Sequence, residues 1–330
     1  MSVLHHSNNL NRIRTGFLLF LLMAFWACSD DDNDPSVPDE QEYTCIFWAC
    51  AGDRTIERAI FEGDSLVARS VIYQGEWETA PSEVVVDPDK QLVYWSDFET
   101  QQICCIPWGG QGAAKTLYAV SSAGGGPIGL AIDASGEQLY WTKPYEDLIM
   151  RAPADGSGPV DTLFTSDDGI NGAWGIGISL AAGYLYWVEY RDAELYRVPA
   201  DLSASPDRIY AGGSGFLRPY GLAVSDDSDD LFIVDNPLPG AGKSDCIYLG
   251  TTDGRTGLQA IYTAGEVSNA YNLVVIPEDD AVYWLNQLNS GSIYRGSMDG
   301  TAPATLLIND INIGEGLAVV KILSSPDRIF

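Results

Sequence analysis

An internal repeat that begins near Thr44 constrains the fold more than any other feature of the chain. Each copy ends a short apolar run with two adjacent large apolar residues, and successive pairs are 47, 46, 46, 46 and 51 residues apart. A unit of this length cannot bury its own faces, so the copies must stack on one another. The six pairs are Phe47-Trp48, Tyr94-Trp95, Tyr140-Trp141, Tyr186-Trp187, Phe232-Ile233 and Tyr283-Trp284.

Each copy contains four short β-type runs separated by turns of Gly, Asp or Pro. In the third copy these runs are 129–133, 138–142, 148–152 and 160–164. Four-stranded units of this length arranged radially form a β-propeller. A linear solenoid is the alternative, although its repeats are usually shorter and need distinct caps.

The two ends of the repeat distinguish a closed ring from a linear array. The pair at Phe47 lacks the apolar run that lies 11 residues before the other pairs, and the missing run appears at the other end of the chain as 314–320. The C-terminus therefore supplies the inner strand of a blade whose other three strands come from the N-terminus. Such closure removes open sheet edges. The sequence predicts an all-β fold, a six-bladed β-propeller of four-stranded blades over residues 44–322.

The repeat carries motifs that point to a known family. Tyr94-Trp95-Ser96-Asp97 and Tyr140-Trp141-Thr142-Lys143 follow a Gly-Leu-Ala-Ile-Asp type of run and precede an Arg and an Asp-Gly turn. From Thr44 to Val320 the chain thereby resembles the YWTD, or LDL-receptor class B, repeat. That resemblance implies a rigid disc for protein recognition, with no cofactor or catalytic residue to carry over. The fourth motif position keeps Asp only at Asp97 and Asp235, and elsewhere has Cys50, Lys143, Glu189 and Asn286, so its bonding there is an open question.

The N-terminus resembles an export and lipidation signal. Arg12 and Arg14 precede the apolar run 17–27, which is too short to span a bilayer but suits a signal peptide. The residues that end at Cys28 resemble a bacterial lipobox, and the acidic run 29–34 resembles the surface-export signal of Bacteroidetes lipoproteins. An ordinary cleaved signal followed by a polar linker is the alternative.

These features predict how the chain is divided and where it resides. We expect a signal peptide over 1–27, an acidic disordered tether over 28–43 and a C-terminal tail over 323–330. Lipidation of Cys28 would anchor the protein in the outer membrane, exposed at the cell surface, with the lipid as its only membrane contact.

Charge and histidine content exclude several classes of function. The net charge is −28, and removing the leader leaves about −30, which disfavours nucleic acid as a partner because phosphate binding needs clustered cations. The two histidines, His5 and His6, lie in the leader, so histidine-dependent nucleophilic catalysis and imidazole-bound zinc are excluded from the mature chain. We expect no metal and no cofactor, while a Ca²⁺ ion in the channel mouth stays an open alternative.

The sequence leaves cysteine pairing open. Beyond Cys28 the chain has five cysteines, so at most two bridges can form. A bridge between Cys50 and Cys105 and a set of buried free thiols are equal alternatives, and no spacing suggests zinc. The five residues are Cys45, Cys50, Cys104, Cys105 and Cys246.

A candidate ligand-binding face follows from propeller topology, because the loops between blades and the loops between second and third strands open on the same side. Aromatic residues in these loops have no core of their own, which suits a recognition surface unless some of them plug the channel. We therefore predict a monomeric, surface-displayed module that binds an extracellular protein, peptide or glycan. The predicted ligand-binding residues are Trp77, Phe98, Tyr145, Trp174, Tyr190, Phe216, Tyr220 and Tyr271.

The alternative function is a propeller hydrolase, either a carboxylate-pair glycosidase or a lactonase-like metal enzyme. The oxygen-bearing loop residues that such a metal enzyme would draw on are Asp235, Asn236, Glu266, Asn269 and Asn272.

Overall fold

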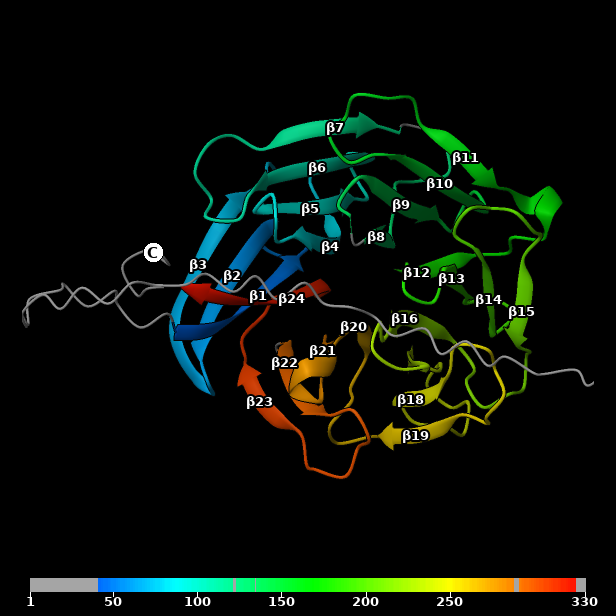
Figure 1. Cartoon of the computed structure of the whole chain (residues 1–330). Helices are drawn as coiled ribbons and strands as arrows, with labels where there is room; N and C mark the ends of the chain where they lie inside the picture. The colour runs from blue at the N-terminus through cyan, green and yellow to red at the C-terminus, as the bar shows by residue number, and fades with distance from the viewer. Residues whose placement is uncertain (1–40, 121–122, 134, 288–290, 325–330) are drawn as a thin grey trace, which may run out of the picture. The chain divides into compact units, whose positions relative to one another are not determined.

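Six four-stranded antiparallel sheets surround a central channel (Figure 1). The structure, a computed structural model, describes residues 41–120, 123–133, 135–287 and 291–324. The predicted all-β, six-bladed propeller is confirmed. The predicted signal peptide, Cys28 and the tether up to residue 40 lie outside the described residues. Within the described part of the chain, no helix is long and apolar enough to cross a membrane.

The strands of each blade run from the channel outwards. The inner strands are β4 (Pro81–Asp87), β8 (Leu130–Ile132), β12 (Ala173–Ser179), β16 (Pro219–Val224), β20 (Ala270–Ile276) and β24 (Gly314–Ser324). The second strands are β5 (Leu92–Asp97), β9 (Gln138–Lys143), β13 (Tyr184–Glu189), β17 (Asp230–Asp235), β21 (Ala281–Asn286) and β1 (Gln41–Cys50).

The outer half of each blade completes the sheet. The third strands are β6 (Gln102–Pro107), β10 (Leu148–Pro153), β14 (Glu194–Pro199), β18 (Cys246–Thr251), β22 (Ser292–Ser297) and β2 (Thr55–Glu62). The outermost strands are β7 (Lys115–Ala119), β11 (Asp161–Phe164), β15 (Asp207–Tyr210), β19 (Gln259–Tyr262), β23 (Thr305–Ile308) and β3 (Ser65–Gln74). Two short 3₁₀ helices, η1 (Ser166–Asp168) and η2 (Pro277–Asp279), lie in connections.

The ring closes through the first and last strands, as the offset of the repeat predicts. β24 pairs antiparallel with β1, with Leu317 opposite Trp48 and Ala318 opposite Phe47. Each inner strand also contacts the inner strands of both neighbouring blades, so the six form a continuous ring. The pairing extends from Gln41 to Ser324, slightly beyond the predicted range 44–322 at both ends.

The aromatic pairs form the core between blades. Because alternate residues of a strand point to opposite faces, the two members of a pair enter different cores. Tyr94 packs with Trp141 of the next blade, whereas Trp95 packs with Phe47 of the preceding blade. The same arrangement repeats around the ring and gives six apolar clusters, each between two blades.

The five described cysteines are buried free thiols. Cys50 packs in the cluster around Trp48, and Cys105 in the cluster around Trp141, so the two side chains belong to different inter-blade cores. The bridge between them, one of the two alternatives left by the sequence, is therefore not formed.

Candidate functional site

One side of the disc, here called the loop face, carries the connections between blades and those between second and third strands. The fourth motif position lies at the end of each second strand and bonds the backbone of the blade-joining connection beside it. Asp97, Glu189, Asp235 and Asn286 accept from backbone N–H groups, at 2.6–3.1 Å. Lys143 Nζ and Cys50 Sγ instead donate to the carbonyl oxygens of Val120 and Asn312, at 2.9 and 2.8 Å. The fourth position thus has Asp in two copies and Glu, Asn, Lys or Cys in the other four. In all six copies its side chain holds the connection in place.

Six aromatic rings on the loop face form one continuous contact series, here called the aromatic cluster. Trp174 occupies its centre, with ring centroids 4.8 Å from Tyr220, 5.1 Å from Tyr190 and 6.2 Å from Tyr145. The series extends to Phe98, 5.9 Å from Tyr145, and to Tyr271, 4.7 Å from Tyr220. The members of the cluster are Phe98, Tyr145, Trp174, Tyr190, Tyr220 and Tyr271. Most of these contacts are edge-to-face, a favourable geometry for aromatic pairs.

Two guanidinium groups lie over rings of the cluster: that of Arg191 over Tyr190, at 5.4 Å, and that of Arg218 over two rings. Arg218 Cζ is 5.1 Å from the ring centroid of Tyr220 and 5.8 Å from that of Tyr190, which is cation–π geometry. None of the ion pairs among the described residues includes Arg218. By contrast, Arg191 pairs with Asp147 at 2.6 Å. The cluster therefore presents rings together with one positive charge that has no acidic partner in this part of the chain.

The structure brings together six of the eight predicted ligand-binding residues and separates the other two. Phe216 is 0% exposed and packs in the core around Tyr186 and Ile233, so it has no surface to offer a ligand and is removed from the predicted face. Trp77 is 76% exposed on the β3–β4 connection and has no ring contact among the described residues. Tyr220 is only 2% exposed and forms the floor of the cluster.

The aromatic prediction missed aliphatic residues on the same face. Leu217, Leu238 and Ile313 are exposed in three different connections of the loop face. Leucine and isoleucine are common in cores, so their types gave no signal. Their positions beside turn-rich connections could have identified them.

The loop face surrounds a narrow entrance to the channel. Inside, a cavity of about 240 Å³ is lined by aliphatic residues of all six inner strands. On each inner strand, one residue pairs with the Trp or Ile of the neighbouring second strand. The residue directly before it on the inner strand forms the narrowest level of the channel. Four inner strands have glycine at this level: Gly129, Gly175, Gly221 and Gly316.

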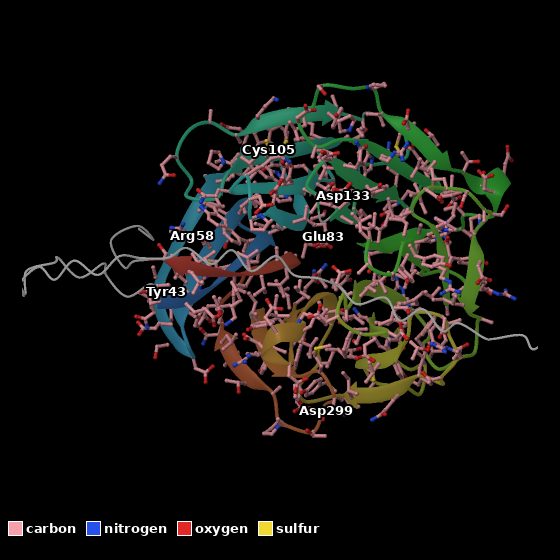
Figure 2. All side chains as sticks on the ribbon, in the orientation of Figure 1. Tyr43, Arg58, Glu83, Cys105, Asp133 and Asp299 are labelled. Atoms are coloured by element: carbon pink, nitrogen blue, oxygen red, sulfur yellow. The ribbon has the colours of Figure 1, made fainter. Side chains whose placement is uncertain are left out.

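Close approach of neighbouring blades requires these glycines. A Cβ at Gly175 would lie 2.2 Å from the carbonyl oxygen of Tyr220, and one at Gly316 would lie 2.4 Å from that of Ser82. The remaining two strands have polar residues at this level, Glu83 and Asn272. Figure 2 places Glu83 at the centre of the ring of blades.

Buried acids with altered pKa values lie at and near the loop face. Burial raises the pKa of Glu83 to about 8 and those of Glu189 and Glu315 to about 7. The carboxylate of Glu189 accepts from Trp187 Nε1 at 2.9 Å and from the backbone of Asn171, so it serves the fourth motif position.

The predicted metal-enzyme residues do not converge in the channel. Asn236 and Asn269 bond each other at 2.6 Å, and Asp235 accepts from the backbone of the blade-joining connection beside it. Glu266 accepts from the backbone of Ala304 near the outer strand β23. Of these residues, only Asn272 lines the channel cavity.

A second group of potential ligands lies at the end of β1 and comprises Cys50, Asp53 and Glu57. Glu57 is already paired with Arg69 at 3.1 Å, and burial raises the pKa of Cys50 to about 11. Because a metal needs the thiolate, this group is a poor metal site.

Comparisons with known proteins agree on the fold. No protein-family model and no curated protein matches the chain. A chain of the crystal structure of a nidogen/laminin complex matches with a TM-score of 0.68 and 18% identity over 84% of this chain and 98% of that one. A putative TolB from Agrobacterium tumefaciens gives 0.59 and 12% over 86% and 99%. An inactive histidine-to-alanine variant of virginiamycin B lyase from Staphylococcus aureus, with quinupristin, gives 0.55 and 17% over 72% and 74%. At these identities the likeness establishes the fold alone.

Proposed function

We propose that this protein is a recognition module that holds a protein or peptide partner on its loop face. The observation that carries the proposal is the aromatic cluster with Arg218 lying over two of its rings. Tyr, Trp and Arg dominate the affinity of protein interfaces because they cover large areas with few rotatable bonds. Exposed Trp77, Leu217 and Leu238 enlarge the apolar surface on the same face, and such surfaces mark interaction sites.

Charge narrows the chemistry of the partner. A net charge of −28 repels strongly acidic proteins at long range, so the partner should be neutral or basic as a whole. Arg218 favours one carboxylate at the point of contact. The nidogen/laminin structure, whose fold this chain shares, is a complex, which supports a protein partner over a glycan.

A lyase or hydrolase function has less support. The lyase relative is described as inactive when a histidine is replaced, and this chain has histidine only at His5 and His6, outside the described residues. Of the candidate metal residues of the hydrolase alternative, only Asn272 lines the channel cavity, and the other four are bonded to one another or to backbone.

The proposal includes display at the cell surface through a lipid on Cys28, as the leader predicts. Labelling cells with an alkyne fatty acid tests this anchor. The label should be incorporated by the native chain and lost in Cys28→Ala. Equal labelling of both chains would refute the anchor and leave the binding proposal intact.

The binding proposal is tested by selecting ligands from a displayed peptide library, with a glycan array in parallel. Selected peptides should bind the native protein, and their affinity for Trp77→Ala and for Tyr145→Ala should be at least tenfold lower. Both residues are exposed on the loop face. The matched control is Leu180→Ala, an exposed apolar residue in the β12–β13 connection, on the other side of the disc. Equal loss in the control, no selected peptide, or binding to glycans alone would contradict the proposal.

A further inference from the structure

The narrowest level of the channel contains two polar side chains, Glu83 and Asn272, which are not part of the aromatic cluster. Glu83 and Asn272 come from β4 and β20, two strands separated in the ring by β24. Their side chains meet across Gly316 of that intervening strand, and Asn272 Nδ2 donates to Glu83 Oε2. Glu315, also on β24, accepts from Gln287 Nε2 at 3.1 Å. We call Glu83, Asn272 and Glu315 the channel neck.

The acids of the neck have no cation beside them. Neither Glu83 nor Glu315 forms an ion pair in the described ranges, and each receives neutral donors: Glu83 from Asn272 and the backbone of Val84, Glu315 from Gln287. Their mutual repulsion adds to burial in raising the pKa of Glu83. Two like charges in a confined space favour either protonation or a bound cation.

The amide of Asn272 decides between these alternatives. The residue is 8% exposed, and its Oδ1 has no hydrogen-bond partner among the described residues, although its Nδ2 already contacts the Glu83 carboxylate. A buried amide oxygen without a donor costs free energy and calls for an occupant. Exchanging the oxygen and nitrogen of the amide would place an oxygen against Glu83, which is unfavourable while that carboxylate is ionised.

Space for one small occupant lies beside the two acids of the neck. A cavity of about 10 Å³ is lined by Ser82, Glu83 and Glu315, together with the rings of Trp174, Tyr220 and Tyr271. That volume holds about one water-sized particle. A peptide side chain or a sugar is too large for it, whereas a water molecule or a bare metal ion fits, and the two like charges favour the cation.

We propose that the channel neck binds one divalent cation of Ca²⁺ type. Carboxylate and amide oxygens are the ligands that Ca²⁺ prefers, and the neck has no nitrogen or sulfur ligand suited to zinc. Glu83, Asn272 and Glu315 supply the first oxygens, with backbone carbonyls and water from the channel completing the shell. The three ligands belong to three successive blades, one of which is shared by the two ends of the chain. The cation therefore stabilises the closure of the ring, a function separate from partner binding on the loop face.

Terbium luminescence and thermal unfolding test the site in the purified full chain after EDTA treatment and desalting. Tb³⁺ occupies Ca²⁺ sites and emits when a nearby aromatic residue is excited, and Trp174 lines the same small cavity. We expect saturable Tb³⁺ emission that Ca²⁺ displaces. At a hundredfold excess of Ca²⁺ over its Kd, we expect a rise in Tm of about 4–5 °C.

Variants of the neck separate a specific site from general attraction to an acidic protein. Glu83→Gln and Glu315→Gln should each lose at least tenfold in Ca²⁺ affinity, while their Tm in EDTA stays equal to or above that of the native chain, because a buried repulsion is removed. Glu266→Gln is the control, a loop carboxylate that contacts Ala304 outside the neck. Absence of displaceable emission, absence of a Tm shift, or an equal response in all variants would overturn the proposal.

Discussion

Replacing Asp235 by alanine should remove the hydrogen bonds that hold one blade-joining connection against its blade. Asp235 is buried at the end of β17, and its carboxylate accepts from Leu217 N at 3.0 Å and from Arg218 N at 2.6 Å. The alanine variant leaves two backbone N–H groups without this acceptor, at roughly 1–3 kcal/mol each. Removing a carboxylate whose pKa is raised by burial offsets part of that cost. We therefore expect the free energy of unfolding to fall by about 2–4 kcal/mol.

Urea unfolding followed by circular dichroism measures this change. Asp235→Asn keeps one acceptor oxygen and should lose about half as much. Asp229→Ala is the control, because its carboxylate is exposed and pairs only with exposed Arg255, an interaction worth about 0–1 kcal/mol. A loss below about 0.5 kcal/mol in Asp235→Ala, or an equal loss in the control, would refute the idea that the fourth motif position holds the connection.

Three further predictions concern the core. Gly175→Ala should destabilise the ring by about 1–3 kcal/mol because its Cβ would meet the Tyr220 carbonyl, whereas Gly177→Ala, with no atom nearer than 3.8 Å, should be tolerated in the same urea assay. Burial raises the pKa of Glu189 from 4.5 to about 7, so its contribution to the free energy of unfolding is present below pH 4.5 and is lost towards pH 7. Relative to Glu189→Gln, the stability of the native chain should therefore fall by about 3 kcal/mol between pH 4.5 and pH 7. A difference that does not change with pH would contradict this. The five described thiols should react with Ellman's reagent only after unfolding; a count of three in the unfolded chain would indicate a disulfide.

The sequence predicted the ring because the position at which the repeat starts and stops can be read from the sequence alone. The missing inner run before Phe47 and the extra run at 314–320 required a shared blade, and the pairing of β1 with β24 confirms it. Alternation along a strand likewise explains why Tyr94 and Trp95 enter different cores. Both arguments depend on spacing, which a sequence states directly.

Burial on the loop face depends on how each connection folds back, which spacing does not give. Tyr220 and Phe216 are near neighbours in the chain, yet the ring of Tyr220 belongs to the aromatic cluster and that of Phe216 enters the core between two blades. Similarly, the contact of Glu83 with Asn272 joins residues far apart in the sequence. The sequence did contain one signal for this contact. Glu83 and Asn272 stand at the inner-strand position where other blades have glycine, as at Gly175 and Gly316.

The loop face is held rigid by buried bonds whose chemistry varies from blade to blade. Lys143 donates to a carbonyl where Asp97 accepts from an N–H, so the repeat conserves the attachment of the connection and not one residue type. Connections fixed in this way position the aromatic cluster before any partner arrives. A preorganised surface loses little conformational entropy on binding, which raises affinity. A rigid face with packed rings and one cation that lacks an acidic partner among the described residues supports the recognition function that we propose.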